Sequence, residues 1–261
     1  MFDKLVAKLG YEVRDRGNRK LFDRELRQIF CHIPPRELTI FDVGCYYGES
    51  IERFSTLFPG CTKFSFEPDN EPYIKVKHKY QHNDNISIHN FGVGADDGFA
   101  KFYRCTVPGN SSFNNILESS NWAKQRARIQ GVEPTDLIKS VEEISVRSLG
   151  SFTEEQGVNH IDILKLDCEG WENECLRGCE SLLYANKVHV IQLELVTTEI
   201  REHTITIEEI RELIPNNHFD YFIAKHRQIP FTSSPKLYEV LLENGWLENY
   251  DRDTILYTLR L

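Results

Sequence analysis

Short apolar runs alternate with amphipathic segments along the first third of this chain. The runs at 38–44, 63–67 and 85–90 are rich in β-branched and aromatic residues and end in glycine, glutamate or asparagine. Between them, 49–58 and 72–80 carry apolar residues at helical spacing. The order strand, helix, strand, helix, strand predicts a parallel sheet with crossover helices.

The alternation is interrupted over 98–147 and then resumes. Residues 98–107 predict an extra strand, and a polar stretch with a short helix near Trp122 follows; a connection of this length is uncommon unless it has a function. Beyond it we expect strands at 160–167, 187–196, 219–224 and 254–261, and helices at 149–156, 171–183, 207–214 and 236–243. The predicted fold class is α/β: a Rossmann-like, mostly parallel seven-stranded sheet with helices on both faces, an antiparallel last strand and an inserted region over the substrate side.

Composition narrows the class of protein. Forty per cent hydrophobic and 27% charged residues are typical of a globular protein, and the net charge of −9 argues against a nucleic-acid partner. We see neither the apolar stretch of a signal peptide nor the roughly 18 apolar residues of a membrane span. The seven cysteines form no paired framework, so we expect a reduced, cytoplasmic setting.

Acidic residues and glycines gather where the predicted strands end. In open parallel sheets, ligands bind outside the carboxyl ends of the strands. The segments at these ends are Asp42 to Gly48, Glu67-Pro68, Asn90 to Gly94, Asp167 to Gly170, and Glu194. In the first, Gly44 lets backbone approach a ligand closely and Gly48 lets the next helix start against the strand; the pattern is not the G-x-G-x-x-G of dinucleotide folds. Glu67 can accept both hydrogen bonds from a ribose diol.

Taken together, these segments resemble the class I S-adenosylmethionine-dependent methyltransferases, and more narrowly the FkbM family. The resemblance covers about 40–196, in the pieces FDVGCYYG, FSFEPDNEPY, NFGVGADDGFAKFY, VRSLGSF, IDILKLDCEGWENECLRG and IQLEL. The most specific piece is DILKLDCEGWE at 162–172, which matches the family's aspartate–x–glutamate–glycine–x–glutamate. Tyr46 stands where the family usually has asparagine, and Ala95 where it usually has aspartate.

The resemblance implies S-adenosyl-L-methionine as cofactor and S-adenosyl-L-homocysteine as product. Its methionine part is expected beside the Asp42–Gly48 turn, its ribose on Glu67 and its adenine by Gly92 and Val93. The expected cofactor-binding residues are Asp42, Gly44, Cys45, Tyr46, Gly48, Glu67, Pro68, Asn90, Gly92 and Val93. We expect an N-terminal helical extension at 1–36 and a methyltransferase domain at 37–261, within which 98–147 is the acceptor-binding region.

Asp167, Glu169 and Lys165 are the candidate catalytic residues. If the acceptor is an alcohol, its proton must leave as the oxygen attacks, and a carboxylate can take it. Three roles stay open for Asp167 and Glu169. In the first role, one of the two carboxylates is the general base. In the second, both bind a divalent metal together with Glu194, and in the third, they cap the helix at 171–183. No metal ligand is assigned.

The predicted function is S-adenosylmethionine-dependent O-methylation of a hydroxyl on a sugar, glycan precursor or polyketide-like metabolite; the oxygen acceptor follows from the resemblance. Ser111, Ser112 and Glu194 are expected to contact this small-molecule or carbohydrate acceptor. Two alternatives remain. The first is an NAD-dependent Rossmann oxidoreductase, but the G-x-G-x-x-G expected of that class is missing from this sequence. The second is a non-catalytic cofactor-binding domain, which the departures from the family pattern at Tyr46 and Ala95 leave open. The sequence predicts neither the acceptor's identity nor the oligomeric state.

Overall fold

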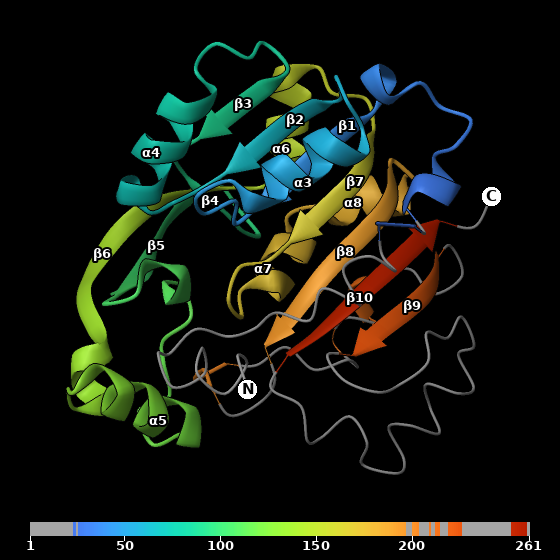
Figure 1. The fold of residues 1–261 in the computed structure, drawn as a ribbon. Helices are drawn as coiled ribbons and strands as arrows, with labels where there is room; N and C mark the ends of the chain where they lie inside the picture. Colours follow the sequence, from blue (N-terminus) through green and yellow to red (C-terminus); the bar gives the residue numbers. More distant parts are fainter. Residues whose placement is uncertain are drawn as a thin grey trace, which may run out of the picture.

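A computed structural model describes residues 23–24, 26–196, 200–203, 209, 212–214, 219–225 and 252–259. Its main sheet has the strand order β3-β2-β1-β7-β8-β10-β9 (Figure 1). The strands are β1 (Thr39–Val43), β2 (Thr62–Phe66), β3 (Ile86–His89), β7 (Ile161–Leu166), β8 (Val188–Val196), β9 (Phe219–Lys225) and β10 (Arg252–Leu259). β3, β2, β1, β7 and β8 pair in parallel, and β10 pairs antiparallel with both β8 and β9. The predicted Rossmann-like, mostly parallel sheet is confirmed.

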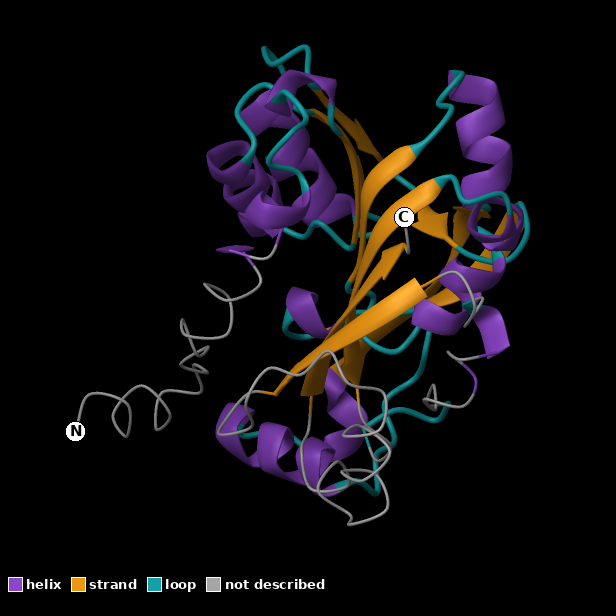
Figure 2. Cartoon of the chain, turned by 90° about the vertical axis from the view of Figure 1, so that its right-hand side faces the viewer, coloured by secondary structure: helices purple, strands orange, loops and turns teal. Residues whose placement is uncertain are grey.

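Helices cover both faces of this sheet (Figure 2). They are α3 (Glu49–Leu57), α4 (Asn70–Tyr80), α6 (Leu149–Gln156), α7 (Glu172–Arg177) and α8 (Glu180–Tyr184), with a 3₁₀ turn, η1, at Pro35–Glu37. Successive strand residues pack on opposite faces: Phe41 and Val43 belong to the core under α6, α7 and α8, whereas Ile40 packs with α3. A strand buried on both faces must be apolar throughout, which explains the continuous runs in the sequence.

The inserted region forms a second, smaller sheet of order β4-β6-β5. β4 (Gly92–Val93) precedes the insertion, whose own elements are β5 (Gly98–Cys105), η2 (Pro108–Asn110), α5 (Asn121–Gln130), η3 (Pro134–Leu137) and β6 (Ile138–Arg147). In Figure 1 this sheet and α5 lie on the side toward which the arrowheads of β1, β2, β3, β7 and β8 point. The insertion therefore stands at the carboxyl ends of the parallel strands.

The helix predicted at 171–183 is instead two helices, α7 and α8. Between them, Gly178 lies so close to the carbonyl of Gly94 that a Cβ at this position would overlap the oxygen. The carbonyl oxygen of Gly178 also accepts a 2.9 Å hydrogen bond from the N–H of Gly150. The close approach of the Gly94 backbone interrupts the helix at Gly178. The spacing of apolar residues within the helix cannot predict such a contact.

The predicted N-terminal extension is described only in part. Residues 26–29 are helical, and Leu26 and Phe30 pack against α3 and the sheet. The rest of the predicted extension before residue 23 lies outside the described residues, as does the helix predicted at 236–243.

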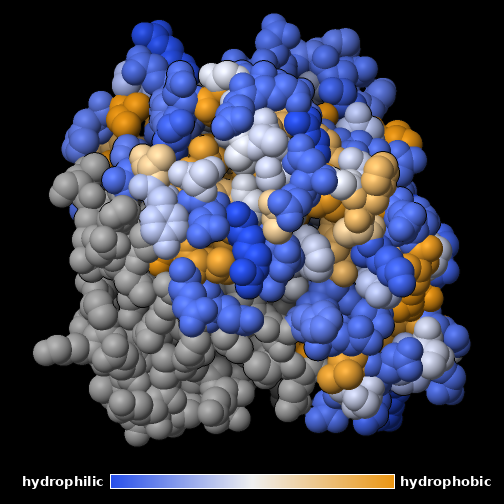
Figure 3. Space-filling model, turned by 180° about the vertical axis from the view of Figure 1, so that it is seen from behind, coloured by the Kyte–Doolittle hydropathy of each residue, from blue (hydrophilic) through white to orange (hydrophobic). Residues whose placement is uncertain are grey.

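The face shown in Figure 3 is mostly hydrophilic, with small separate apolar patches. Scattered apolar side chains are normal on protein surfaces. Among the helices that the structure describes, none combines the length and the apolar character needed to cross a membrane.

We predict that Gly44→Ala lowers the free energy of unfolding by more than about 3 kcal/mol. Gly44 has φ 77°, and a Cβ there would overlap the carbonyl oxygen of Asp167. Gly131 is the control because it is also left-handed, at φ 68°, but has nothing within 4 Å of the added Cβ. Gly131→Ala should cost only about 1 kcal/mol. Urea denaturation of both variants measures the difference, and equal losses would contradict this account of Gly44.

Candidate active site

The turn after β1 is fixed by backbone contacts on several sides. The N–H groups of Gly44 and Cys45 donate to the carbonyl of Phe66 at the end of β2, at 3.0 and 3.2 Å. Gly48 has φ 91° and precedes α3, and a Cβ there would stand 3.0 Å from the ring of Tyr80 on α4. The turn therefore joins the carboxyl ends of β1 and β2, with no side chain at its two glycines.

Glu67 is a buried carboxylate directly beside this turn. Its Oε2 accepts a hydrogen bond from the N–H of Tyr46 at 2.8 Å, and its Oε1 accepts one from the N–H of Asp69 at 2.9 Å. Burial raises the pKa of Glu67 to about 8, although the two N–H donors lower it. Asn90 donates to the carbonyl oxygens of Glu67 and Pro68, at 3.0 and 3.3 Å. These hydrogen bonds bring together predicted cofactor residues from the ends of three strands.

Tyr46 links the turn to the insertion. Its φ of 49° is left-handed, a conformation that asparagine tolerates better than tyrosine. Its ring lies against that of Tyr47, with centroids 4.1 Å apart, and next to the backbone of Gly109 in η2. Burial, before any other cause, raises the pKa of Tyr46 to about 12. The position where the chain departs from the family pattern therefore carries a ring that contacts the insertion.

A line of polar side chains runs across the sheet from α3 to the end of β7. The hydroxyl of Ser50 donates to Asp42 Oδ2 at 2.5 Å. Lys165, the cross-strand partner of Asp42, lies with its Nζ 3.4 Å from Asp42 Oδ1. The same Nζ donates to Asp167 Oδ2 at 3.1 Å. Two of the three predicted catalytic residues thus form one charge-paired group with a predicted cofactor residue.

The loop after β7 is organised by Glu172. This residue is fully buried, and its Oε1 accepts hydrogen bonds from the N–H groups of Cys168 and Gly170 at 2.8 and 3.3 Å. Burial raises the pKa of Glu172 to about 7. The N-cap residue of α7 is Trp171, which makes no side-chain cap. Glu169 lies within the loop at φ 54°.

The insertion binds this same loop through backbone groups. The hydroxyl of Ser112 is buried and donates to the carbonyl of Cys168 at 3.0 Å, and Asn114 Nδ2 donates to that of Gly170 at 2.8 Å. The hydroxyl of Ser111 accepts from the N–H of Cys105. The hydroxyls of the two serines predicted to contact the acceptor thus form hydrogen bonds with backbone groups in this structure.

The remaining predicted residues are placed as follows. Gly92 and Val93 form β4, where Gly92 packs against the Phe113 ring and the carbonyl of Val93 accepts a 3.1 Å hydrogen bond from Trp171 Nε1. Cys45 is buried, and burial raises its pKa well above its usual value. Glu194 belongs to β8, and its side chain lies outside the described residues.

Sequence reasoning missed two arginines. Arg201 is 1% exposed, and its Nη2 lies 3.3 Å from Glu169 Oε2. Arg104 of β5 reaches Asp69 at 3.5 Å and Glu142 at 3.1 Å. Arg201 belongs to no predicted strand or quoted motif, and Arg104 lies one residue beyond the quoted NFGVGADDGFAKFY. The one available signal is their chemistry, because a charged side chain next to an apolar strand needs a partner.

Acidic side chains dominate the mouth of the sheet. They are Asp42, Glu67, Asp69, Asp167, Glu169 and Glu172. Within the described residues, no three His, Cys, Asp or Glu side chains are grouped so as to hold a metal ion.

Two comparisons with known sequences bear on this site. Residues 42–222, more than half of the chain, match the family model described as the methyltransferase FkbM domain. The 2-O-methyltransferase NoeI of Sinorhizobium fredii (strain NBRC 101917 / NGR234) is 24% identical over 191 residues, which cover 73% of this chain and 76% of that protein.

Solved structures resemble the chain more distantly. An rRNA methylase from Streptococcus thermophilus matches with a TM-score of 0.47 and 7% identity, covering 95% of this chain and 99% of that one. The plantazolicin methyltransferase BpumL, in complex with a monoazolic desmethylPZN analog and SAH, matches with a TM-score of 0.45 and 12% identity. The match covers 99% of this chain and 88% of that one.

We predict that Glu67 makes the stability of the protein depend on pH. Because its folded pKa of about 8 lies above the ordinary value of 4.5, the folded state holds a proton that the unfolded state releases. The contribution of Glu67 to the free energy of unfolding is fully present below pH 4.5 and is lost as the pH rises toward 8. The loss amounts to at most about 1.4 kcal/mol per pH unit. Glu67→Gln should remove this loss.

Denaturation of wild type and Glu67→Gln across this range measures the effect. The stability advantage of the variant should grow with pH and level off above about 8. Glu52→Gln, the same change at an exposed carboxylate on α3, is the control. An advantage that does not change with pH would contradict the prediction.

Proposed function

This chain belongs to the FkbM family of methyltransferases, and we propose that it transfers a methyl group from S-adenosylmethionine to a hydroxyl of a small-molecule or carbohydrate acceptor. Family membership implies the cofactor. The observation that carries the assignment of the site is Glu67, a buried carboxylate joined through Tyr46 to the glycine turn after β1. Support for oxygen as the acceptor atom is the similarity to NoeI, a 2-O-methyltransferase.

The residues at the mouth fit this cofactor. A ribose diol donates two hydrogen bonds, and a carboxylate at the end of the second strand of a Rossmann-like sheet is the group that accepts them. Glu67 is held in place by two backbone N–H groups before any ligand binds. We infer that the turn from Asp42 to Gly48 holds the methionine part and that Gly92 and Val93 border the adenine.

When bound, S-adenosylmethionine supplies a methyl group on a positively charged sulfur, which keeps the electron pair of the broken C–S bond while the acceptor oxygen forms the new C–O bond. The protein's part is to align the acceptor and to exclude water. The proton of the hydroxyl must also leave, and Asp167 and Glu169 are the carboxylates of the loop at this mouth. Lys165 keeps Asp167 in position through its hydrogen bond.

The acceptor is proposed to bind between this loop and the insertion. The insertion at 98–147 stands at the carboxyl ends of the strands and contacts the loop through Ser112. In this proposal, 37–261 is the methyltransferase domain, built on seven strands with an antiparallel last strand, and 1–36 is a helical extension. Ser111, Ser112 and Glu194 remain proposed contributors to the acceptor side.

Calorimetry tests the proposed function. Wild-type protein should bind S-adenosylhomocysteine and not NAD. At a pH above about 8, where Glu67 is ionised, Glu67→Gln should weaken S-adenosylhomocysteine binding by about 1–3 kcal/mol, because a charge-assisted hydrogen bond to the ribose is lost. Glu52→Gln should bind like wild type, since Glu52 lies on the exposed side of α3 and pairs with Lys79.

Other outcomes identify the alternatives. Binding of NAD without S-adenosylhomocysteine would support an oxidoreductase. Binding of S-adenosylhomocysteine without methyl transfer to any hydroxylated acceptor would support a non-catalytic domain.

A further inference from the structure

A buried arginine connects the loop after β7 with the insertion. Arg201 Nη1 donates to the carbonyl of Asn114 at 3.1 Å, and its Nη2 donates to that of Asn110 at 2.8 Å. Its Nη2 also donates to Glu169 Oε2 at 3.3 Å. A guanidinium without solvent is costly unless it is hydrogen-bonded and paired with an anion. Glu169 supplies that negative charge.

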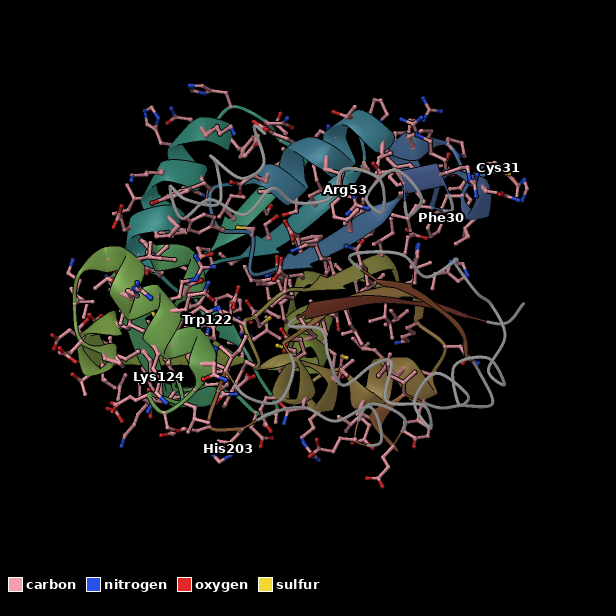
Figure 4. All side chains as sticks on the ribbon, turned by 60° about the horizontal axis from the view of Figure 1, so that its bottom comes forward. Phe30, Cys31, Arg53, Trp122, Lys124 and His203 are labelled. Atoms are coloured by element: carbon pink, nitrogen blue, oxygen red, sulfur yellow. The ribbon has the colours of Figure 1, made fainter. Side chains whose placement is uncertain are left out.

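The backbone around Arg201 is fixed by a second set of contacts. The segments 114–117 and 200–203 lie side by side, joined by a β-bridge at Arg201 and by backbone hydrogen bonds. Asn114 hydrogen-bonds both the N–H and the carbonyl of His203. Figure 4 labels His203 at the end of the second segment and Trp122 on α5 of the insertion. The arginine is thus anchored to the insertion by its own main chain.

The loop residue that Arg201 contacts has an unusual backbone. Glu169 has φ 54°, which residues with side chains seldom adopt and which persists only where the surroundings enforce it. The next residue, Gly170, packs against Arg201, where a Cβ would lie 3.1 Å from Arg201 Cγ. Arg201 therefore restrains the loop twice, through the carboxylate of Glu169 and through the surface of Gly170.

The two carboxylates of the loop have different partners. Glu169 pairs with Arg201, which is anchored to the insertion. Asp167 pairs with Lys165, a strand residue of the main sheet. Asp167 also has the more exposed side chain of the two, at 23% against 12%.

We propose that Arg201 is a positioning residue for methyl transfer, acting through Glu169 to hold the loop at 167–170 against the insertion. Glu169 then serves as the counter-ion of Arg201, and Asp167 is the carboxylate that receives the acceptor's proton. This division of roles rests on the proposed function; the restraint on the loop does not.

Amide hydrogen exchange tests the restraint without any acceptor. The N–H groups of Cys168 and Gly170 are hydrogen-bonded to Glu172. In Arg201→Met they should exchange at least about tenfold faster than in wild type, with an intermediate rate in Arg201→Lys, which keeps the charge. Arg53→Met is the matched control, because Arg53 is a largely buried arginine paired with Asp23, away from the loop. Unchanged exchange in both Arg201 variants would overturn the proposal.

Kinetics test the division of roles. Release of S-adenosylhomocysteine from S-adenosylmethionine is followed with a set of methyl glycosides as acceptor probes. Arg201→Met and Glu169→Gln should each lower kcat about 100-fold, and the double variant should lose no more than either single variant. Affinity for S-adenosylhomocysteine should stay within about threefold of wild type, and Arg201→Lys should recover about tenfold in kcat.

Each failure has its own signature. Additive losses in the double variant, or recovery of kcat when both charges are removed, would refute the positioning role. Full activity of Asp167→Asn would refute its assignment as proton acceptor. If wild type binds no S-adenosylhomocysteine, the proposed function fails, while the exchange measurement still decides whether Arg201 restrains the loop.

Discussion

The backbone contact between Gly44 and the carbonyl of Asp167 determines how close the segment after β1 lies to the segment after β7. Because no side chain separates them, the turn after β1 and the loop after β7 form one surface at the mouth of the sheet. The parallel register sets Asp42 opposite Lys165, so the polar residues fall on the α3 side of the strands. The apolar residues that alternate with them fill the core on the other face.

Burial of acidic groups is the main electrostatic cost of this arrangement. Glu67 and Glu172 are desolvated, and burial is the first cause of the raised pKa of each. Each accepts two backbone N–H hydrogen bonds, which offset part of that cost. Asp42 and Glu169 instead face Lys165 and Arg201. The site thus combines carboxylates held by neutral donors with carboxylates held by cations.

The sequence was sufficient to predict the mostly parallel sheet and the residues that lie at the carboxyl ends of its strands. Asp42 lies next to the last residue of β1, and Glu67 and Asp167 directly follow β2 and β7, so the positions of these three residues could be predicted from the strand ends. The break at Gly178 depends on Gly94, and the contacts of Arg201 depend on the insertion, both far away in the chain. No local pattern records such contacts. Ser112 was expected to contact the acceptor, and in the structure its hydroxyl donates to the carbonyl of Cys168.

The manner in which the insertion is attached has a consequence for how the family can diversify. Ser112 and Asn114 bind the loop through the carbonyl oxygens of Cys168 and Gly170. Every amino acid carries that oxygen, so these two bonds do not depend on the side chain at position 168. A substitution at position 168 can therefore accumulate without breaking these two bonds, provided that Ser112 and Asn114 are kept. The loop after β7 and the insertion can thus change at different rates within one continuous fold.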